Sequence, residues 1–329
     1  MKVGIIGCGL IGAKRSHALA GAQLVACADR DLARAQTLAG KFSGVRACAH
    51  PEEVATAGDV DIVVVATPHD SLAPLTLQAV RSGKHVLVEK PAARSATELE
   101  PVAAEAKRLG RLVRVGFNHR YHRAFRKARE LCASGALGPL MFLRARYGHG
   151  GRPGYEKEWR AIPEISGGGE LIDQGVHLID LSRMFLGDFS EAWGHTATFF
   201  WKMPVDDNAF LMLRTPSGQV AWLHASATEW KNTFSMEIYG RDGKLQIDGL
   251  GGSYGTERLT FYRMLPEMGP PETSAWEFPM ADDSWSVEFA EFLKDIQIGR
   301  QPDPNLDDAI AALQVVARIY KESRHAHHP

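Results

Sequence analysis

The sequence predicts an α/β protein of two domains, a doubly wound parallel sheet followed by a domain built on an antiparallel sheet. Its 329 residues exceed the length of one ordinary domain. The first 118 residues alternate strand-like and helix-like segments, which is typical of parallel strands joined by crossover helices. Later segments alternate apolar and polar residues between turn signals such as Arg241-Asp242-Gly243, which indicates antiparallel strands.

The strands expected in the first domain are short, continuously apolar or β-branched runs, as in sheets buried on both faces. They span Lys2–Gly7, Leu24–Asp29, Asp61–Thr67, His85–Lys90 and Leu112–Phe117, with Val45–His50 as a weaker sixth candidate. Helices are expected between them over Ile11–Ala20, Leu32–Phe42, Ser71–Ser82 and Ala96–Leu109. The first domain is therefore placed at residues 1–118.

The pattern changes after Phe117. Helices are expected over Tyr121–Ser134, Glu170–Phe185, Ser286–Ile298 and Asp307–Ser323. Strands are expected over Leu140–Tyr147, Ala192–Trp201, Ala209–Arg214, Val220–Ala227, Phe234–Tyr239 and Lys244–Asp248. Residues 119–329 are assigned to the second domain, and we leave open that the last helix packs back on the first.

Composition excludes several classes of function. Lys plus Arg number 38 and Asp plus Glu 39, a balance that gives no global attraction to nucleic acid or to an anionic membrane. The longest apolar stretches have strand length, so we expect no membrane span, and Met1-Lys2 leads into a strand rather than a secretory signal. The four cysteines form no CxxC pair, which predicts a cytoplasmic protein with buried thiols and no metal site. The tail His325–His328 is interpreted as a frayed terminus rather than a metal site.

The first motif that carries chemistry is Gly7-Cys8-Gly9-Leu10-Ile11-Gly12, which follows the first strand and opens a helix. Glycines at these positions allow a tight turn, the approach of a pyrophosphate to backbone N–H groups and close packing of helix on strand. Asp29 ends the second strand, 22 residues after Gly7, and this context favours a dinucleotide site over three turn glycines. We therefore expect cofactor contacts from Gly7, Gly9, Leu10, Ile11 and Gly12.

Asp29 decides which cofactor we expect. Its carboxylate can accept hydrogen bonds from the ribose hydroxyls of adenosine and would repel a 2′-phosphate, so NAD is predicted and NADP is less favoured. Arg30 tempers this preference, because a guanidinium can stack on adenine or meet a phosphate. The other interpretation of Asp29 is a helix N-cap, a role that Asp31 fills better.

Two further motifs lie along the chain. Glu89-Lys90-Pro91 ends the fifth strand, at the edge where open α/β sheets bind ligands. Gly167-Gly168-Gly169 precedes a predicted helix. On that helix Asp173 and His177 are four residues apart and share a face, with Asp180 on nearly the same stripe. A carboxylate can orient an imidazole and favour its cation, but a capped helix with a satisfied histidine fits this segment equally well.

Together these motifs resemble the glucose–fructose oxidoreductase / inositol dehydrogenase / MocA family over essentially the whole chain. Further matches are Ala66-Thr67-Pro68, Gly83-Lys84-His85-Val86, Gly116-Phe117-Asn118 with Arg120, and Trp159-Arg160. The resemblance implies a Rossmann domain followed by an α/β domain with an open, mostly antiparallel sheet, whose face commonly builds dimers or tetramers. It also implies NAD(P)-dependent oxidation of a sugar or cyclitol hydroxyl, or reduction of the matching ketone.

Carried over by position, the family's catalytic lysine, aspartate and histidine fall on Lys90, Asp173 and His177. The chemistry agrees, because an imidazole such as His177 can accept a hydroxyl proton and Lys90 can stabilise negative charge on the reacting oxygen. Asp173 can position a substrate hydroxyl and tune His177. No metal is needed, because nicotinamide takes the hydride. The resemblance also predicts a cis Lys90–Pro91 peptide bond.

Further cofactor contacts are expected from Thr67, Pro68 and His69 after the fourth strand, and from Glu89 and Lys90 after the fifth. The sequence departs here from the family's usual T-P-N-x-x-H, because His69 stands at the Asn position and Leu72 at the His position. His69 is either a cofactor contact or a loop residue, and we favour the contact.

Substrate contacts are expected from Asn118, Arg120, Tyr147, Tyr155, Arg160, Asp173 and His177. The loop over 147–160 mixes aromatic rings, which stack on the C–H faces of sugars, with groups that bind hydroxyls. Its other interpretation is a loop that packs on its own domain. Glu156 leaves an aminosugar or aminocyclitol as open as a neutral sugar.

Residues 107–129 contain nine basic residues and no acidic one. The functional interpretation is an anionic ligand, such as a nucleotide-linked or carboxylated sugar. The other interpretation is a solvated helix face, which we favour for Arg123–Arg129.

The leading hypothesis is an NAD-dependent dehydrogenase that oxidises a secondary hydroxyl of a sugar, aminosugar or cyclitol, or reduces the ketone. The alternatives are an NAD-dependent glycoside hydrolase that uses transient oxidation and a non-catalytic NAD-sensing regulator. Intact Lys90, Asp173 and His177 argue against the regulator, which needs no proton-transfer groups. The expected partners are a small-molecule substrate and further copies of the chain, in a homodimer or homotetramer through the C-terminal sheet.

Overall fold

The computed structural model describes residues 1–325, so Ala326, His327 and His328 of the histidine tail lie outside the described residues. The chain forms two compact units. The first contains Met1–Asn118 and Trp285–Ala311, and the second contains His119–Ser284 and the described residues 312–325. No helix within residues 1–325 is both long and apolar enough to cross a bilayer.

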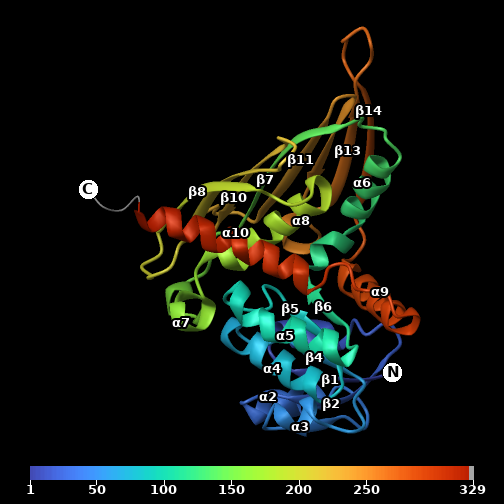
Figure 1. Cartoon of the computed structure of the whole chain (residues 1–329), viewed down its shortest axis with the longest axis vertical. Helices are drawn as coiled ribbons and strands as arrows, with labels where there is room; N and C mark the ends of the chain where they lie inside the picture. The colour runs from blue at the N-terminus through green and yellow to red at the C-terminus, as the bar shows by residue number, and fades with distance from the viewer. Residues whose placement is uncertain (326–329) are drawn as a thin grey trace. The chain divides into compact units, whose positions relative to one another are not determined.

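A six-stranded parallel sheet forms the first unit, in the order β3-β2-β1-β4-β5-β6. Its strands are β1 (Lys2–Ile6), β2 (Gln23–Ala28), β3 (Arg46–Cys48), β4 (Ile62–Val65), β5 (His85–Glu89) and β6 (Val113–Gly116). The helices, drawn in blue to cyan in Figure 1, are α1 (Leu10–Ser16), α2 (Leu32–Ala39), α3 (Glu52–Ala55), α4 (His69–Arg81) and α5 (Ala96–Leu109). The strand order reverses between β1 and β4, which is the edge position where open α/β sheets bind ligands. The predicted doubly wound sheet is confirmed.

The strands of this sheet are buried as their apolar runs predict. Every residue of β4 is buried, and only Lys2 of β1 is exposed. The helix α3 was not predicted, since its four residues are too few for a helical period to appear.

Helix α9 (Ser284–Ile298) adds buried ion pairs to the first unit. Arg15 of α1 is fully buried, donates to Glu89 at 2.7 Å and pairs with Glu288 of α9. Arg114 of β6 pairs with Asp295 of α9 at 2.5 Å. A buried guanidinium is stable only beside its counter-charge. Phe289 and Phe292 of α9 also lie in the hydrophobic core of this unit, so ion pairs and apolar packing together join residues 285–311 to residues 1–118.

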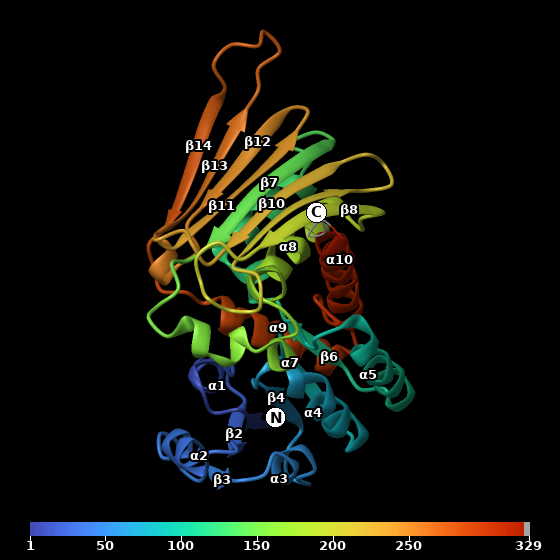
Figure 2. The ribbon, with the colours of Figure 1, turned by 90° about the vertical axis from the view of Figure 1, so that its left-hand side faces the viewer.

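An eight-stranded sheet forms the second unit, in the order β14-β13-β12-β11-β7-β10-β9-β8, which Figure 2 shows side by side. Its strands are β7 (Leu140–Gly148), β8 (Glu191–Ala197), β9 (Asn208–Arg214), β10 (Val220–Ser226), β11 (Thr233–Gly240), β12 (Gly243–Asp248), β13 (Glu257–Arg263) and β14 (Glu272–Phe278). Only the neighbours β7 and β10 run parallel, so the mostly antiparallel sheet is confirmed.

The strands β13 and β14 were not predicted. β14 lies at the edge of the sheet and its side chains are mostly exposed, so Glu272–Phe278 shows no alternation of apolar and polar residues. Backbone pairing with β13 creates this strand rather than burial.

Helices cover one face of the sheet. α6 (Arg123–Ala133) packs on β12, β13 and β14, and α8 (Val176–Leu186) packs on β7 and β10. The other helical segments are η1 (Asn118–Tyr121), η2 (Tyr155–Lys157), η3 (Trp159–Ala161), α7 (Pro163–Ser166), the π-helical η4 (Leu171–Gly175), η5 (Gly252–Tyr254) and α10 (Leu306–His325). On the opposite face Trp193, Met212 and Trp222 pair in register and are 40%, 45% and 51% exposed. This face therefore carries a band of exposed apolar side chains across β8, β9 and β10.

Candidate active site

The glycine loop after β1 contains two glycines that the fold itself requires. Gly7 has a φ of +96°, and a Cβ there would lie 2.3 Å from the carbonyl oxygen of Ala66. A Cβ on Gly12 would lie 1.8 Å from the carbonyl oxygen of Gly7. A Cβ on Gly9 would meet nothing within 4 Å. The loop is therefore tightly built at both ends and open at Gly9.

Asp29, at the end of β2, binds the same loop. Its Oδ2 accepts a hydrogen bond from the Cys8 N–H at 2.8 Å, and its Oδ1 accepts one from the Asp31 N–H at 2.9 Å. Asp31 accepts from Ala33 and is the N-cap of α2, as the sequence suggested. The contact with Cys27, burial and the charge of Asp29 raise the pKa of the Cys8 thiol, which is therefore inert.

The segments after β4 and β5 hold the other residues predicted to bind the cofactor. His69 is the first residue of α4 and is 3% exposed. Thr67 Oγ1 is a buried hydroxyl oxygen with no hydrogen-bond partner among the described residues. Lys90 is partly buried, and the Lys90–Pro91 bond is cis, as predicted. Glu89 has a structural partner in Arg15, and its contact with a cofactor stays a prediction.

The second glycine run approaches its own protein closely. A Cβ on Gly169 would lie 1.9 Å from the carbonyl oxygen of Asp206, and one on Gly168 would lie 2.1 Å from the hydroxyl of Tyr320. The Asp206 carboxylate accepts hydrogen bonds from the N–H groups of Gly169 and Leu171, at 3.0 and 2.8 Å, and from the Tyr320 hydroxyl at 2.7 Å. Burial raises the pKa of Asp206 to about 6, although these donors oppose the shift. The carboxylate fixes where the next helical segment begins.

That segment differs from the helix that the sequence predicts. It begins as the π-helix η4 and continues as α8, so Asp173 lies in the wider π turn and His177 in the α-helix. A π turn needs more than four residues to complete, so the equivalence of i and i+4 positions assumed for an α-helix is only approximate here. Asp173 and His177 are 5% and 4% exposed. Both residues predicted to be catalytic in this unit are buried.

Each of these two side chains has a defined neighbour. Arg160 of η3 donates from Nε to Asp173 Oδ2 at 2.9 Å. His119 of η1 stacks on His177, with ring centroids 3.6 Å apart and planes 14° from parallel. Tyr147 of β7 packs edge-on against His177 with centroids 6.1 Å apart. The structure thus brings together Tyr147, Arg160, Asp173 and His177, all of which the sequence singled out.

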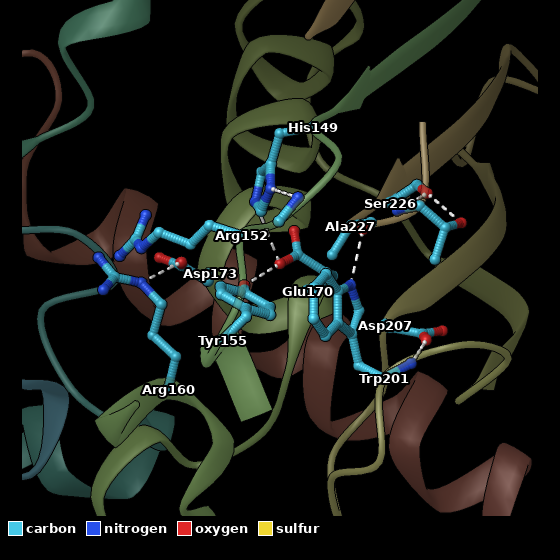
Figure 3. Close-up of polar contacts among 12 residues, drawn as sticks. His149, Arg152, Tyr155, Arg160, Glu170, Asp173, Trp201, Asp207, Ser226 and Ala227 are labelled. Atoms are coloured by element: carbon cyan, nitrogen blue, oxygen red, sulfur yellow. Dashed lines mark hydrogen bonds and ion pairs between the residues drawn. The ribbon is translucent and has the colours of Figure 1, made fainter. Parts of the chain in front are cut away.

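A second carboxylate lies beside this group. Figure 3 shows His149 and Tyr155 facing Glu170, while Arg160 reaches Asp173. The Tyr155 hydroxyl donates to Glu170 Oε1 at 2.5 Å, and His149 Nε2 lies 3.4 Å from the same oxygen. Burial lowers the pKa of His149, but the hydrogen bond and charge of Glu170 outweigh it and the net pKa is raised. Tyr155 therefore has a buried acceptor inside the unit, and its contact with substrate stays a prediction.

The basic stretch at 107–129 is largely neutralised by carboxylates. Within the first unit Arg108 pairs with Glu105 and Arg114 with Asp295. In the second unit the pairs are Arg120 with Asp180, Arg123 and Arg126 with Asp283, and Lys127 with Glu130. These pairs favour a structural role over an anion site. Asn118, 5% exposed, belongs to the first unit, and the substrate contacts predicted for Asn118 and Arg120 stay predictions.

Sequence reasoning gave no site role to four residues of this region, His119, His149, Glu170 and Asp206, although His149 and Glu170 lie within segments that it singled out. Each of them is recognised only by a partner that is distant in the sequence. His119 contacts His177, 58 positions away, and His149 contacts Glu170, 21 positions away. Glu170 contacts Tyr155, 15 positions away, and Asp206 contacts Tyr320, 114 positions away. Asp206 lies outside every motif found in the sequence, so no local pattern pointed to it. No group of His, Cys, Asp and Glu side chains within the described part of the chain is suited to hold a metal ion.

Comparison with known families accounts for both units. Residues 1–117 match the model described as "Oxidoreductase family, NAD-binding Rossmann fold", and residues 125–246 match the "GFO/IDH/MocA C-terminal domain". The chain belongs to the Gfo/Idh/MocA family. The resemblance predicted from its motifs is therefore confirmed.

Curated members of the Gfo/Idh/MocA family are similar over much of the chain. Inositol 2-dehydrogenase 2 of Saccharopolyspora erythraea is 32% identical over 226 residues, 66% of this chain and 64% of that protein. D-glucoside 3-dehydrogenase of Escherichia coli is 30% identical over 251 residues, 69% of this chain and 70% of that protein. The match to inositol 2-dehydrogenase 4 of Saccharopolyspora erythraea covers 54% of that protein. The chain therefore matches less than two thirds of the length of both inositol 2-dehydrogenases of this organism.

Solved structures share the fold of the whole chain. A levoglucosan dehydrogenase in complex with NADH gives a TM-score of 0.88 at 23% identity, covering 99% of this chain and 97% of that chain. An aldose-aldose oxidoreductase from Caulobacter crescentus gives a TM-score of 0.86 at 25% identity, covering 99% and 98%. The glycine loop fits the dinucleotide of this family, because only Gly9 faces open space while Gly7 and Gly12 are enclosed by the protein.

Proposed function

We propose that this protein is an NAD-dependent dehydrogenase that oxidises a secondary hydroxyl of a sugar, aminosugar or cyclitol, or reduces the corresponding ketone. The observation that carries the proposal is the buried pair of Asp173 and His177, each held by a specific neighbour, Arg160 and His119. A binding module has no need of such a pair, whereas oxidation of an alcohol needs a proton acceptor beside the hydroxyl.

The reaction divides between the bound dinucleotide and the side chains. When NAD is bound, its nicotinamide supplies the acceptor for the hydride that leaves the carbinol carbon. His177 accepts the hydroxyl proton as the C–O bond becomes a carbonyl, and it returns that proton in the reverse direction. Lys90 donates a hydrogen bond to the reacting oxygen and stabilises the negative charge that develops on it.

Asp173 serves in this scheme as a positioning acceptor. Its contact with Arg160 Nε orients the carboxylate, which we assign as an acceptor for a substrate hydroxyl. Arg160 is itself partly exposed, with 31% of its side chain accessible. We assign Arg160 to the orientation of Asp173 and, through its remaining N–H groups, to the substrate.

The substrate class rests on relatives and on the chemistry of the loop over 147–160. Relatives carry the names inositol 2-dehydrogenase, D-glucoside 3-dehydrogenase and levoglucosan dehydrogenase, all of which act on polyhydroxylated rings. The basic stretch gives no support to an anionic sugar, since its arginines are largely paired with carboxylates. A neutral ring polyol is the substrate that these contacts favour.

The proposal is tested by measuring NADH formation over a panel of cyclitols, glucosides, anhydrosugars, aminosugars, uronates and nucleotide sugars. We expect one NADH per molecule oxidised, with a higher kcat/KM for NAD than for NADP. Release of free sugar from a glycoside without net NADH would instead support an NAD-dependent hydrolase. No turnover of any panel member, with NAD bound, would support a sensor.

We further propose that the chain assembles through the open face of the eight-stranded sheet and works in the cytoplasm. A groove of about 560 Å³ on that face is lined by Met141, Phe142, Leu143, Arg144, Val220 and Trp222. Exposed apolar surface of this kind marks an interaction site. Trp222→Glu should convert a dimer or tetramer to smaller species in sedimentation velocity. The four cysteines are free thiols, as expected in a reducing compartment.

A further inference from the structure

Two imidazole rings stack face to face in the second unit. His119 of η1 and His177 of α8 have centroids 3.6 Å apart and planes 14° from parallel, and they are 6% and 4% exposed. Aromatic pairs more commonly lie about 4.5–7 Å apart in offset or edge-on geometries. Rings as close as these need surrounding structure to hold them.

A buried ion pair next to the stack supplies that structure. Arg120 follows His119 directly, and Asp180 lies three residues after His177. Arg120 donates from Nε to Asp180 Oδ2 at 2.8 Å and from a terminal nitrogen to Oδ1, and both side chains are almost fully buried. A two-point contact of this kind fixes orientation as well as distance. It therefore sets η1 against α8 in the register that places one ring over the other.

Aromatic rings at right angles enclose the stack. Tyr147 of β7 lies edge-on to both imidazoles, with centroids 5.2 Å from His119 and 6.1 Å from His177. Phe234 of β11 lies edge-on to His119 at 6.3 Å. Burial, followed by the neighbouring Tyr254, raises the pKa of Tyr147 well above its ordinary value. The Tyr147 side chain beside the two rings therefore stays uncharged in the pH range in which imidazoles titrate.

Charged and titratable groups approach the stack from several elements. On the side of His119, His122 lies edge-on at 5.7 Å, and its Nδ1 is 2.9 Å from Glu257 of β13. On the side of His177, Asp173 is paired with Arg160 and Asp180 with Arg120. The repulsion between two protonated imidazoles acts directly across the ring contact, in addition to the effects of these groups.

We propose that His119 is a positioning residue for His177, which holds its ring in one plane and limits the stacked pair to a single proton. The proposal rests on the proposed role of His177 as proton acceptor. Two imidazolium ions this close in a buried site repel each other strongly, so the second proton binds only at a distinctly lower pH than the first. At a pH between these two steps the pair binds one proton in all, which is the number that oxidation of one hydroxyl releases.

The first test follows the imidazole resonances of the full-length protein by NMR from about pH 9 to about pH 5, around the ordinary histidine pKa. His119→Phe and His177→Phe each keep a flat ring in the stack and remove one titrating group. The wild-type pair should titrate in two steps separated by more than about one pH unit. Each variant should titrate in one step lying between them. Wild-type steps that coincide with those of the single variants would overturn the proposal.

A second readout separates positioning from mere packing. His119→Ala should lower kcat by about 10- to 100-fold with little change in KM, because the His177 ring is no longer held in plane. His119→Phe should recover most of that loss, measured with the panel substrate that the wild type oxidises fastest. Thermal midpoints of all variants show that the chain has folded. An unaltered kcat in His119→Ala, or equal losses in the two variants, would contradict the proposal.

The outcomes distinguish this inference from the function on which it rests. If His177→Phe retains turnover, the proton-acceptor role fails, whatever the titrations show. If His177→Phe is inactive but the titrations are uncoupled and His119→Ala is active, only the role of His119 fails.

Discussion

The two glycine-rich segments of the chain use glycine for opposite purposes. In residues 7–12 the glycine at the centre, Gly9, faces open space, so the missing side chain leaves room for a ligand. In residues 167–169 the missing side chains leave room for the protein itself. Gly168 packs against Tyr320 and Gly169 against Asp206, so closely that a Cβ at either position would overlap an atom of its neighbour. The first loop shapes a binding surface, and the second fixes the start of the segment that carries Asp173 and His177.

The side chains beside each loop differ as well. Asp29 holds the first loop by accepting the Cys8 N–H. Beyond the second loop, Asp173 and Glu170 are held by Arg160 and Tyr155. We therefore expect added volume to weaken ligand binding at the first loop and to destabilise the fold at the second, where the loss of a single charge should also make stability depend on pH.

The largest effect is expected from Gly169→Ala. Its Cβ would lie 1.9 Å from the carbonyl oxygen of Asp206, and neither backbone can move without breaking the hydrogen bonds between them. Unfolding in urea should show a loss of about 3 kcal/mol or more in the free energy of unfolding. Gly269→Ala is the matched control, because a Cβ there meets nothing within 4 Å. Equal stability of the two variants would remove the distinction between the loops.

Gly9→Ala should leave the fold intact and weaken cofactor binding. Gly9 has a φ of −72°, which alanine adopts without strain, and its Cβ would project into the space that we assign to the pyrophosphate. The Kd for NAD, measured by calorimetry, should rise about 10- to 100-fold, which is about 1.4–2.8 kcal/mol. Gly58→Ala, with open space around its Cβ, should bind NAD as the wild type does. Unchanged affinity in Gly9→Ala would show that the loop does not receive the cofactor in this way.

A smaller effect, dependent on pH, is expected from Glu170→Gln. The pKa of His149 is raised in the folded protein by Glu170, despite the opposing effect of burial. The His149–Glu170 pair therefore contributes stability that is full below the ordinary histidine pKa of 6.5 and is lost as pH rises through the raised folded value. The variant should be less stable than the wild type by about 1–2 kcal/mol near pH 6, and the gap should narrow near pH 9. Tyr155→Phe serves as the control, since it removes a hydrogen bond that does not titrate in this range. A gap that is independent of pH would contradict the ionic description of the pair.

The sequence predicted the cofactor half in detail because its signals are local. Helical spacing placed a helix at Ala96–Leu109, the bounds that α5 has in the structure. The resemblance of Glu89-Lys90-Pro91 to the family's motif predicted the cis bond that is observed. The helix depends on residues within one element, where period and residue type suffice, and the motif lies within one turn.

The rest of the site depends on distant partners that no local pattern specifies. Asp206, 35 residues beyond Leu171, accepts the N–H of Leu171 where the π turn begins, and no local pattern indicates this contact. Arg120 was expected to contact substrate from its motif, yet the structure pairs it with Asp180, 60 residues away. The sequence predicted that Asp180 lies on nearly the same face of the helix as Asp173 and His177, but it did not indicate that Arg120 is its partner. Buried ion pairs of this kind satisfy desolvated charges, and only tertiary structure reveals which residues they join.

The central claim is that His177 exchanges the proton of the substrate hydroxyl while the cofactor binds independently. It is tested most directly by His177→Ala, assayed for NADH formation and for NAD binding on the same preparation. We expect kcat to fall by about two to four orders of magnitude with the Kd for NAD near that of the wild type. His50→Ala, at an exposed histidine of the cofactor half, should match the wild type in both. Near-normal turnover in His177→Ala would contradict the account.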